Sequence, residues 1–244
     1  MAVDNSNRGQ SNVVGVALLL WVVVISMSVL IAGVGVLVER QAASADATRV
    51  ADGMDSALSP IETTGIHRER LSFSQGTLRT VDRQLRILDG STVVRSVDVN
   101  ALVFTAGKRR VAFVAGAIIR GQPGNAWLYT EPPITASLGD DSGVLIVGAP
   151  RIGSTGIVSG KGGVTTTLRT NVTHERERIG NGTYSVAIET VTPGPFARYF
   201  TEQGRTVGQR DIDGDGVESV VVTFEGKRVT YLVIHDLNTE VHSN

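Results

Sequence analysis

The 244-residue sequence contains no cysteine. Disulfides, thiolate nucleophiles, lipidated cysteines and cysteine-ligated metal sites are therefore excluded. Aromatic residues make up only 5% of the chain, and 23 basic against 24 acidic side chains give a formal net charge of −1 with no basic block. A nucleic-acid groove needs clustered Lys and Arg beside stacking aromatic side chains, so we expect no nucleic-acid partner.

The motifs of common hydrolases are also missing. The sequence has no G-x-S-x-G, and its histidines form no H-E-x-x-H motif and no close pair along the chain: His67, His174, His235 and His242. The glycine-rich stretch 159–167 lacks the residue order of a phosphate-binding loop and is expected to be a flexible loop between strands. We therefore expect the protein not to be an enzyme, with its histidines at the surface or on edge strands.

An uncharged run extends from Gln10 to Val38. A helix over Val13 to Val38 would be about 39 Å long, which exceeds the roughly 30 Å hydrocarbon core of a bilayer. The run therefore predicts one membrane-spanning helix near the start of the sequence. It is longer than the apolar region of a cleaved secretory signal, although Ala43-Ser44-Ala45 supplies a cleavage pattern for that alternative.

The residues around the start of the run are a short polar leader ending in Arg8-Gly9, followed by Gln10-Ser11 and the apolar stretch to Leu18. This segment resembles the prepilin-type signal of archaeal type IV pilin-like proteins and archaellins. The resemblance implies that residues 1–9 are a leader, that a prepilin peptidase cuts between Gly9 and Gln10, and that the apolar helix stays on the mature protein.

The whole chain is similar to an uncharacterised family of pilin-like proteins from salt-loving archaea. The similarity includes the segments 46–52, 123–127 and 211–216. It implies that residues 10–60 form a transmembrane or filament-core helix with an extension, which contacts membrane lipid and then other pilin-like subunits. Residues 61–244 would be a β-rich extracellular domain.

Helical character continues past the apolar run. Apolar residues near a 3.6-residue period reach Leu58, and Ser59-Pro60 ends the pattern because the residue before proline avoids the α region. The sequence thus predicts a near-continuous helix from about Ser11 to Leu58, with its second half packed on the extracellular domain. Gly33 and Gly35 suggest a local break near the end of the apolar run.

From Gly65 onward the apolar period changes to two, with turn signals such as Gln75-Gly76 between short runs. Residues 121–133 form a Gly/Pro-rich stretch expected to be a loop carrying Trp127 and Tyr129. One short helix is predicted over Pro195 to Gln203. The fold class is therefore α+β: a long N-terminal hydrophobic helix followed by a mainly antiparallel β domain, either a sandwich or a curved sheet.

Alternating carboxylates mark one candidate cation site. Asp211, Asp213 and Asp215, followed by Gly216, match the first half of a calcium loop, with Glu218 as a further candidate ligand. The twelfth position is Val222 instead of Glu and a strand is expected to follow, which excludes an EF-hand. A looser Ca²⁺ loop and a solvated acidic hairpin turn both remain open, and Ca²⁺ is the one candidate cofactor.

Two N-glycosylation acceptor patterns occur, at Asn171 and Asn181. They matter if the domain lies outside the cell. The pair Asn181-Gly182 is also typical of a hairpin turn.

Together these features favour a pilin-like subunit, minor or adhesive instead of the bulk subunit, located in the cell membrane by a single span with its C-terminal domain outside, or in an extracellular filament. The alternative is an uncleaved single-span protein with an extracellular ligand- or surface-binding domain, for which Trp127 and Tyr129 would form a contact patch.

Overall fold

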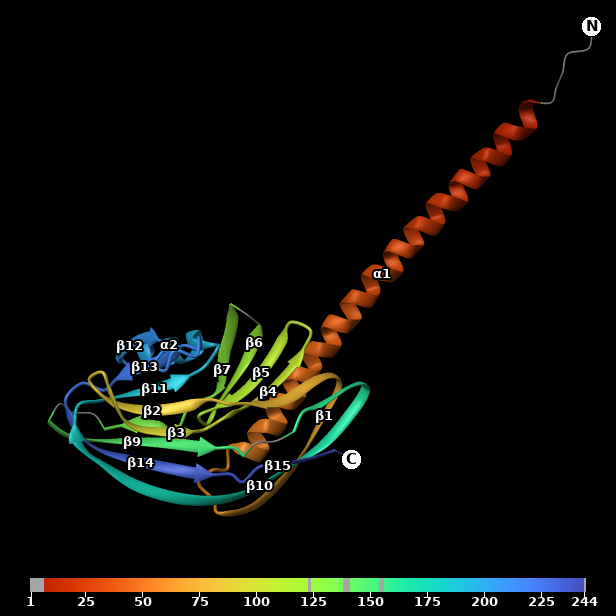
Figure 1. Cartoon of the computed structure of the whole chain (residues 1–244). Helices are drawn as coiled ribbons and strands as arrows, with labels where there is room; N and C mark the ends of the chain where they lie inside the picture. Colours follow the sequence, from red (N-terminus) through yellow and green to blue (C-terminus); the bar gives the residue numbers. More distant parts are fainter. Residues whose placement is uncertain (1–6, 123, 138–140, 154–155, 244) are drawn as a thin grey trace, which may run out of the picture. The chain divides into compact units, whose positions relative to one another are not determined.

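The computed structural model describes residues 7–122, 124–137, 141–153 and 156–243 (Figure 1). Pro123 and residues 1–6 of the expected leader lie outside this set. The chain divides into two compact units, residues 1–42 and 43–244. The second unit therefore begins inside a helix, earlier than the expected start of the β-rich domain at residue 61.

Helix α1 (Asn7–Leu58) is continuous over 52 residues. The expected break at Gly33 and Gly35 is wrong, because the roughly 1 kcal/mol cost of a helical glycine is small beside the cooperativity of the long apolar helix around it. The predicted end at Leu58 is confirmed, and the amide of Ser59 still donates to the Asp55 carbonyl at 3.0 Å.

Within the described residues, the larger of the two sheets has ten strands. All of its strand pairs are antiparallel except β9–β14, which is parallel. Figure 1 shows its curvature, with β1 and β10 side by side. Its strand order is β7 (Asn125–Thr130), β6 (Ala117–Gln122), β5 (Arg109–Val114), β4 (Ala101–Ala106), β1 (Gly65–Val81), β10 (Val158–Gly182), β14 (Lys227–Asp236), β9 (Asp141–Arg151) and β8 (Ile134–Ala136), and β15 (Glu240–Ser243) pairs with β10.

The smaller sheet has five antiparallel strands and packs with the second helix. Its order is β12 (Thr206–Arg210), β13 (Ser219–Thr223), β11 (Tyr184–Glu189), β2 (Gln84–Asp89) and β3 (Thr92–Asp98). Helix α2 (Pro193–Glu202) buries Phe196 and Phe200 against this sheet's side of the core. The mainly antiparallel β fold expected from the period-two pattern is therefore confirmed.

Strand β4 explains the layering, because successive side chains on a strand point to opposite faces. Val103 faces a core shared with the smaller sheet, whereas its neighbours Leu102 and Phe104 face a second core that contains the end of α1. All three are buried. The middle of the large sheet is thus covered on both sides, by the smaller sheet on one and by the end of α1 on the other.

The helix segment Ala43–Leu58 is part of the β-rich unit. Val50, Met54 and Leu58 are fully buried in the second core. An ideal Cβ on Gly53 would lie 2.4 Å from Leu71 Cδ2, so glycine is what lets β1 approach the helix. Packing of the second half of the helix on the β domain, expected from the apolar stripe, is therefore observed.

Four stretches expected to be turns or loops are strands instead. Gln75-Gly76 lies at a bulge within the 17-residue β1, where the register shifts between Phe73 and Gln75. Residues 159–167 belong to β10, and Asn125–Thr130 forms β7. Asn181 and Gly182 also pair with β14 and form no hairpin turn. Long-range pairing supplied hydrogen bonds that the local glycine and proline signals do not reveal.

Candidate functional site

The Asp-rich segment follows β12 and forms a turn held by its own carboxylates. The two oxygens of Asp211 accept hydrogen bonds from the amides of Gly214 and Gly216, at 2.8 and 2.9 Å. These bonds lower the pKa of Asp211. Asp215 accepts from the Val217 amide at 2.8 Å. The carboxylate of Asp211 thus stabilises the turn itself.

The structure brings two of the four predicted ligands together. One carboxylate oxygen from each of Asp213, Asp215 and Glu189 lies within 4.8 Å of the others. Asp211 and Glu218 are not part of this group among the described residues, and the Glu218 carbonyl accepts from the amide of Thr190. Oxygen-only ligands of this kind suit a hard cation such as Ca²⁺.

Two arginines that the sequence did not indicate already neutralise much of this negative charge. Arg86 donates to Asp213 and lies 3.2 Å from Glu189, and Arg83 lies 3.5 Å from Glu189. Glu189 is 3% exposed; burial raises its pKa, and attraction to Arg86 opposes the shift. The group therefore acts first as an ion network joining β2, β11 and the β12–β13 loop, and a cation would have to compete with Arg86.

A signal for the missed residues does exist in the sequence. Arg86 interrupts the apolar run from Leu85 to Leu88 in β2, and Glu189 directly follows the apolar run from Val186 to Ile188 in β11. Charged side chains are rarely buried unless they are paired. Two such charges of opposite sign in strands that pair are therefore a recognisable, although weak, indication of a buried ion pair.

The two predicted glycosylation sites both lie on β10. Asn171 and Asn181 are exposed. The backbone of Asn171 is tied down, because its amide donates to the Leu237 carbonyl at 2.8 Å and its carbonyl accepts from the Asn238 side chain at 3.0 Å. Both side chains are thus placed on the surface, and their modification stays a prediction.

Trp127 and Tyr129 lie on β7 and not on a loop. Tyr129 is 42% exposed and donates to Asp52 at 2.6 Å, a hydrogen bond that raises the pKa of the phenol. The Arg120 guanidinium lies 5.8 Å from the ring centre of Trp127 and also donates to Thr48. These side chains therefore bind the sheet to the end of α1, and only their outer surface is available to a partner.

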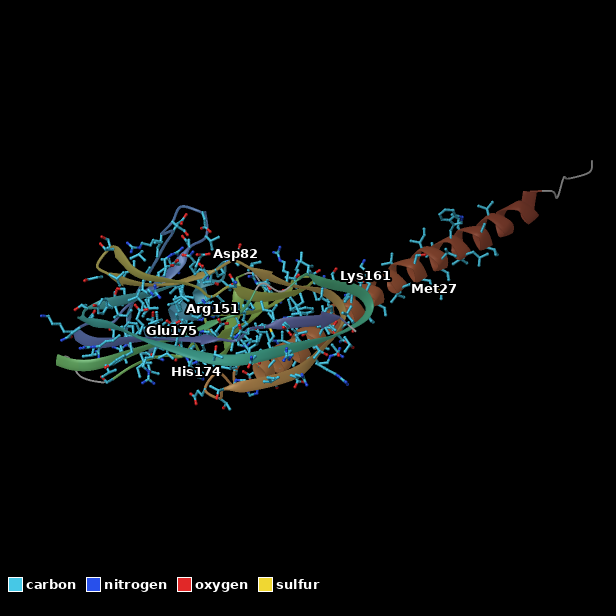
Figure 2. The ribbon with its side chains drawn as sticks, turned by 60° about the horizontal axis from the view of Figure 1, so that its bottom comes forward. Met27, Asp82, Arg151, Lys161, His174 and Glu175 are labelled. Carbon is cyan, nitrogen blue, oxygen red and sulfur yellow. The ribbon has the colours of Figure 1, made fainter. Side chains whose placement is uncertain are left out.

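His174 and His235 meet across β10 and β14, although 61 residues separate them in the sequence (Figure 2, where His174 is labelled). Their Nδ1 atoms are 3.0 Å apart, and Nδ1 of His235 is 3.1 Å from the Ile61 carbonyl oxygen. Burial lowers the pKa of His235. The expectation of a surface or edge-strand position holds for His174, which is exposed, and is wrong for His235, which is half-buried on β14 between β10 and β9.

The apolar part of α1 is the remaining candidate. Gly9 and Gln10 lie near the start of the helix. The window Val14–Ile31 has a mean hydropathy of 2.8 and no buried residue. Side chains such as Leu19, Trp21 and Leu30 are 67–69% exposed. Such a surface is unfavourable in water, and the helix is long and apolar enough to cross a membrane.

These features define the class: a mainly antiparallel β domain preceded by one helix that is long and apolar enough to cross a membrane. Within that class, the chain belongs to the family described as "Family of unknown function (DUF7289)", whose family model matches residues 8–240. No curated protein and no solved structure matches the chain.

Proposed function

We propose that the protein is a type IV pilin-like subunit that is inserted in the membrane before assembly and displays its β domain outside the cell, in a minor or adhesive role. The observation that carries the proposal is the junction Arg8-Gly9-Gln10-Ser11, followed without interruption by an uncharged helix up to Val38. No charged residue has to be removed from lipid when such a helix is extracted or repacked.

The mechanism is structural. Cleavage between Gly9 and Gln10 removes the polar leader from the apolar helix. Neighbouring helices in a filament core then replace lipid around Val14–Ile31, so the exposed apolar surface stays out of water in both states. Small residues four apart, such as Ser11 and Gly15, allow helix backbones to approach closely.

The test is the N-terminal sequence of the mature protein, measured by mass spectrometry on native membranes with and without the prepilin peptidase. We expect a peptidase-dependent start at Gln10. A Gly9→Val variant should keep its leader, whereas Gly15→Val, the same substitution six residues later, should be cut normally. A mature protein that begins at Met1 or after Ala45 would contradict the proposal.

Assembly needs a separate readout. The cleaved protein should sediment with sheared surface filaments, and the Gly9→Val variant should stay with the membrane. If cleaved protein never leaves the membrane fraction, the subunit part of the proposal fails while the processing part stands.

The second candidate function is an uncleaved, single-span membrane protein with an extracellular ligand- or surface-binding domain. The observation that favours it is a cleft in the β-rich unit, lined by two arginines, beside the start of α2. An intact leader, together with ligand binding by the full chain, would make this the better account.

A further inference from the structure

A cleft of about 310 Å³ lies where β5, β6 and β7 meet the segment that begins α2. This volume is in the range of small-molecule sites. Its walls are partly apolar, with Ala112 and Ile119 from the sheet and Pro195 from the helix, and its charged groups are the guanidinium groups of Arg110 and Arg198. No carboxylate side chain is present in its described lining. The cleft is therefore cationic with an apolar wall.

Arg110 points into the layer between the two sheets. It lies on β5 two residues before Ala112, whose side chain faces the core shared with the smaller sheet, and alternate residues of a strand share a face. Its Nε is buried and has no hydrogen-bond partner among the described residues. Burial, with repulsion from Arg83 and Arg79, lowers the pKa of Arg110.

A partly buried cation without a counter-charge is unfavourable for the folded protein. No ion pair of Arg110 is found in the described part of the chain, whereas the nearby Arg86 and Arg83 both pair with Glu189. Packing alone gives no reason for a guanidinium at this position. An anion that enters the cleft would supply the missing partner.

The start of α2 adds to the positive potential. The Gly194 amide lies in the first turn of α2 and so has no intrahelical acceptor. Thr192 makes no side-chain capping hydrogen bond, and Pro193 and Pro195 have no amide hydrogen. The positive end of the helix dipole is also at this end. Arg198, one turn further along the helix, donates to the Ala126 carbonyl, which holds its guanidinium at the cleft.

We propose that this cleft binds a small organic acid, of about the size of one sugar ring or one amino acid. Its carboxylate would pair with Arg110 and Arg198 and accept from the Gly194 amide, because a planar guanidinium matches a carboxylate with two parallel hydrogen bonds. Its carbon skeleton would contact Ile119 and Pro195. The inference does not depend on leader cleavage or on filament assembly.

The experiment is calorimetric titration of the full chain in non-ionic detergent, at fixed ionic strength, with glucuronate and with N-acetylalanine. Glucose and N-acetylalanine amide are the matched neutral probes. We expect saturable binding of at least one acid and none of its neutral counterpart. Binding of glucuronate would indicate the acidic residue of a glycan, and binding of N-acetylalanine would indicate a peptide C-terminus.

The matched variants are Arg110→Gln and Arg109→Gln. Arg109 is the neighbouring residue on β5 and points to the opposite face of the sheet. We expect Arg110→Gln to lower the affinity about tenfold or more and Arg109→Gln to leave it unchanged. Failure of both acids to bind, equal binding by wild type and Arg110→Gln, or equally tight binding of inorganic sulfate would each overturn the proposal.

A stability readout separates loss of the site from loss of the fold. Because Arg110→Gln removes a partly buried charge that has no ion pair among the described residues, the ligand-free variant should have a higher Tm than the wild type, whereas Arg109→Gln should not. A lower Tm for Arg110→Gln would mean that Arg110 supports the fold, and the proposal would then be wrong.

Discussion

Asp46 fixes the end of α1 to the β-rich unit, and its removal should be costly. Its side chain is 0% exposed. One oxygen accepts from the backbone amides of Ser74 and Gln75, at 2.9 and 3.3 Å, and the other from the Ser74 hydroxyl at 3.2 Å. These amides lie at the bulge of β1, where the register of β1 on β10 shifts and Ser74 has no partner residue on β10.

The magnitude follows from the groups that would be left without partners. A hydrogen bond to a charged acceptor contributes about 1.5 kcal/mol or more, so two orphaned amides in Asp46→Ala should lower the free energy of unfolding by about 3 kcal/mol. The ion pair with Arg49, at 2.6 Å, adds little because the Arg49 side chain is 56% exposed. For a unit of this size, the Tm should fall by about 6–12 °C.

The assay is denaturant unfolding of the full chain in detergent, followed by tryptophan fluorescence. The chain has two tryptophans, and Trp21→Phe leaves Trp127 as the reporter in the β-rich unit. Asp52→Ala is the matched control. Asp52 is exposed and, among the described residues, its side chain accepts a hydrogen bond from Tyr129 alone, and both substitutions replace Asp by Ala in a helix and so gain the same helix propensity. We expect a loss below about 1 kcal/mol there, because both side chains are exposed and water replaces the lost partner. Equal losses for Asp46→Ala and Asp52→Ala would refute the reasoning.

Three further predictions concern other parts of the β-rich unit. Gly53→Val should lower the free energy of unfolding by about 1–3 kcal/mol, because the new side chain would collide with Leu71. Ala45→Val, on the exposed side of the helix, should leave the free energy of unfolding nearly unchanged. Equal unfolding midpoints for the two variants would contradict this prediction. Burial lowers the pKa of His235 below its ordinary value of 6.5, so its contribution to stability is present above pH 6.5 and is lost as the pH falls through the folded-state pKa. The Tm of the wild type should therefore fall on acidification, and the Tm of His235→Gln should fall less. Parallel curves of Tm against pH for the two proteins would exclude the His174–His235 pair as the cause. Calcium should bind to Glu189, Asp213 and Asp215 only in the millimolar range, because Arg86 already pairs with two of these three carboxylates. About 10 mM Ca²⁺ should therefore raise the Tm of the wild type and not that of Asp215→Asn. No rise in the wild type would mean that the site does not bind calcium.

The sequence was most informative where local chemistry decides the structure. Ser59-Pro60 correctly predicted the end of α1, and the alternating apolar pattern correctly predicted a β-rich unit of antiparallel strands. Gly76 shows the limit of such reasoning. A polar residue followed by glycine is typical of a turn, yet Gly76 lies within β1. An ideal Cβ at this position would be 2.6 Å from the Phe104 ring, so only glycine fits there. Close approach to a side chain 28 residues away requires the glycine, and no local pattern reports that.

The candidate sites follow the same rule. The acidic turn was predictable because Asp211, Asp213 and Asp215 are close in sequence and shape their own loop. Their partners are Arg86, 127 residues from Asp213 in the sequence, and Glu189; these lie on the paired strands β2 and β11, and the sequence alone gives only a weak indication of them. The same is true of the His174–His235 pair, which the register of β10 on β14 creates.

That the second compact unit starts at Ala43 has a practical consequence for any attempt to isolate it. A fragment cut at Ile61, the start of the β-rich domain expected from the sequence, would lack Val50, Met54 and Leu58 and leave Phe73 and Phe104 uncovered. A fragment that begins at Ala43 keeps these side chains and omits the apolar window. The boundary between the β-rich unit and the apolar window therefore lies in the middle of a helix, not at its end.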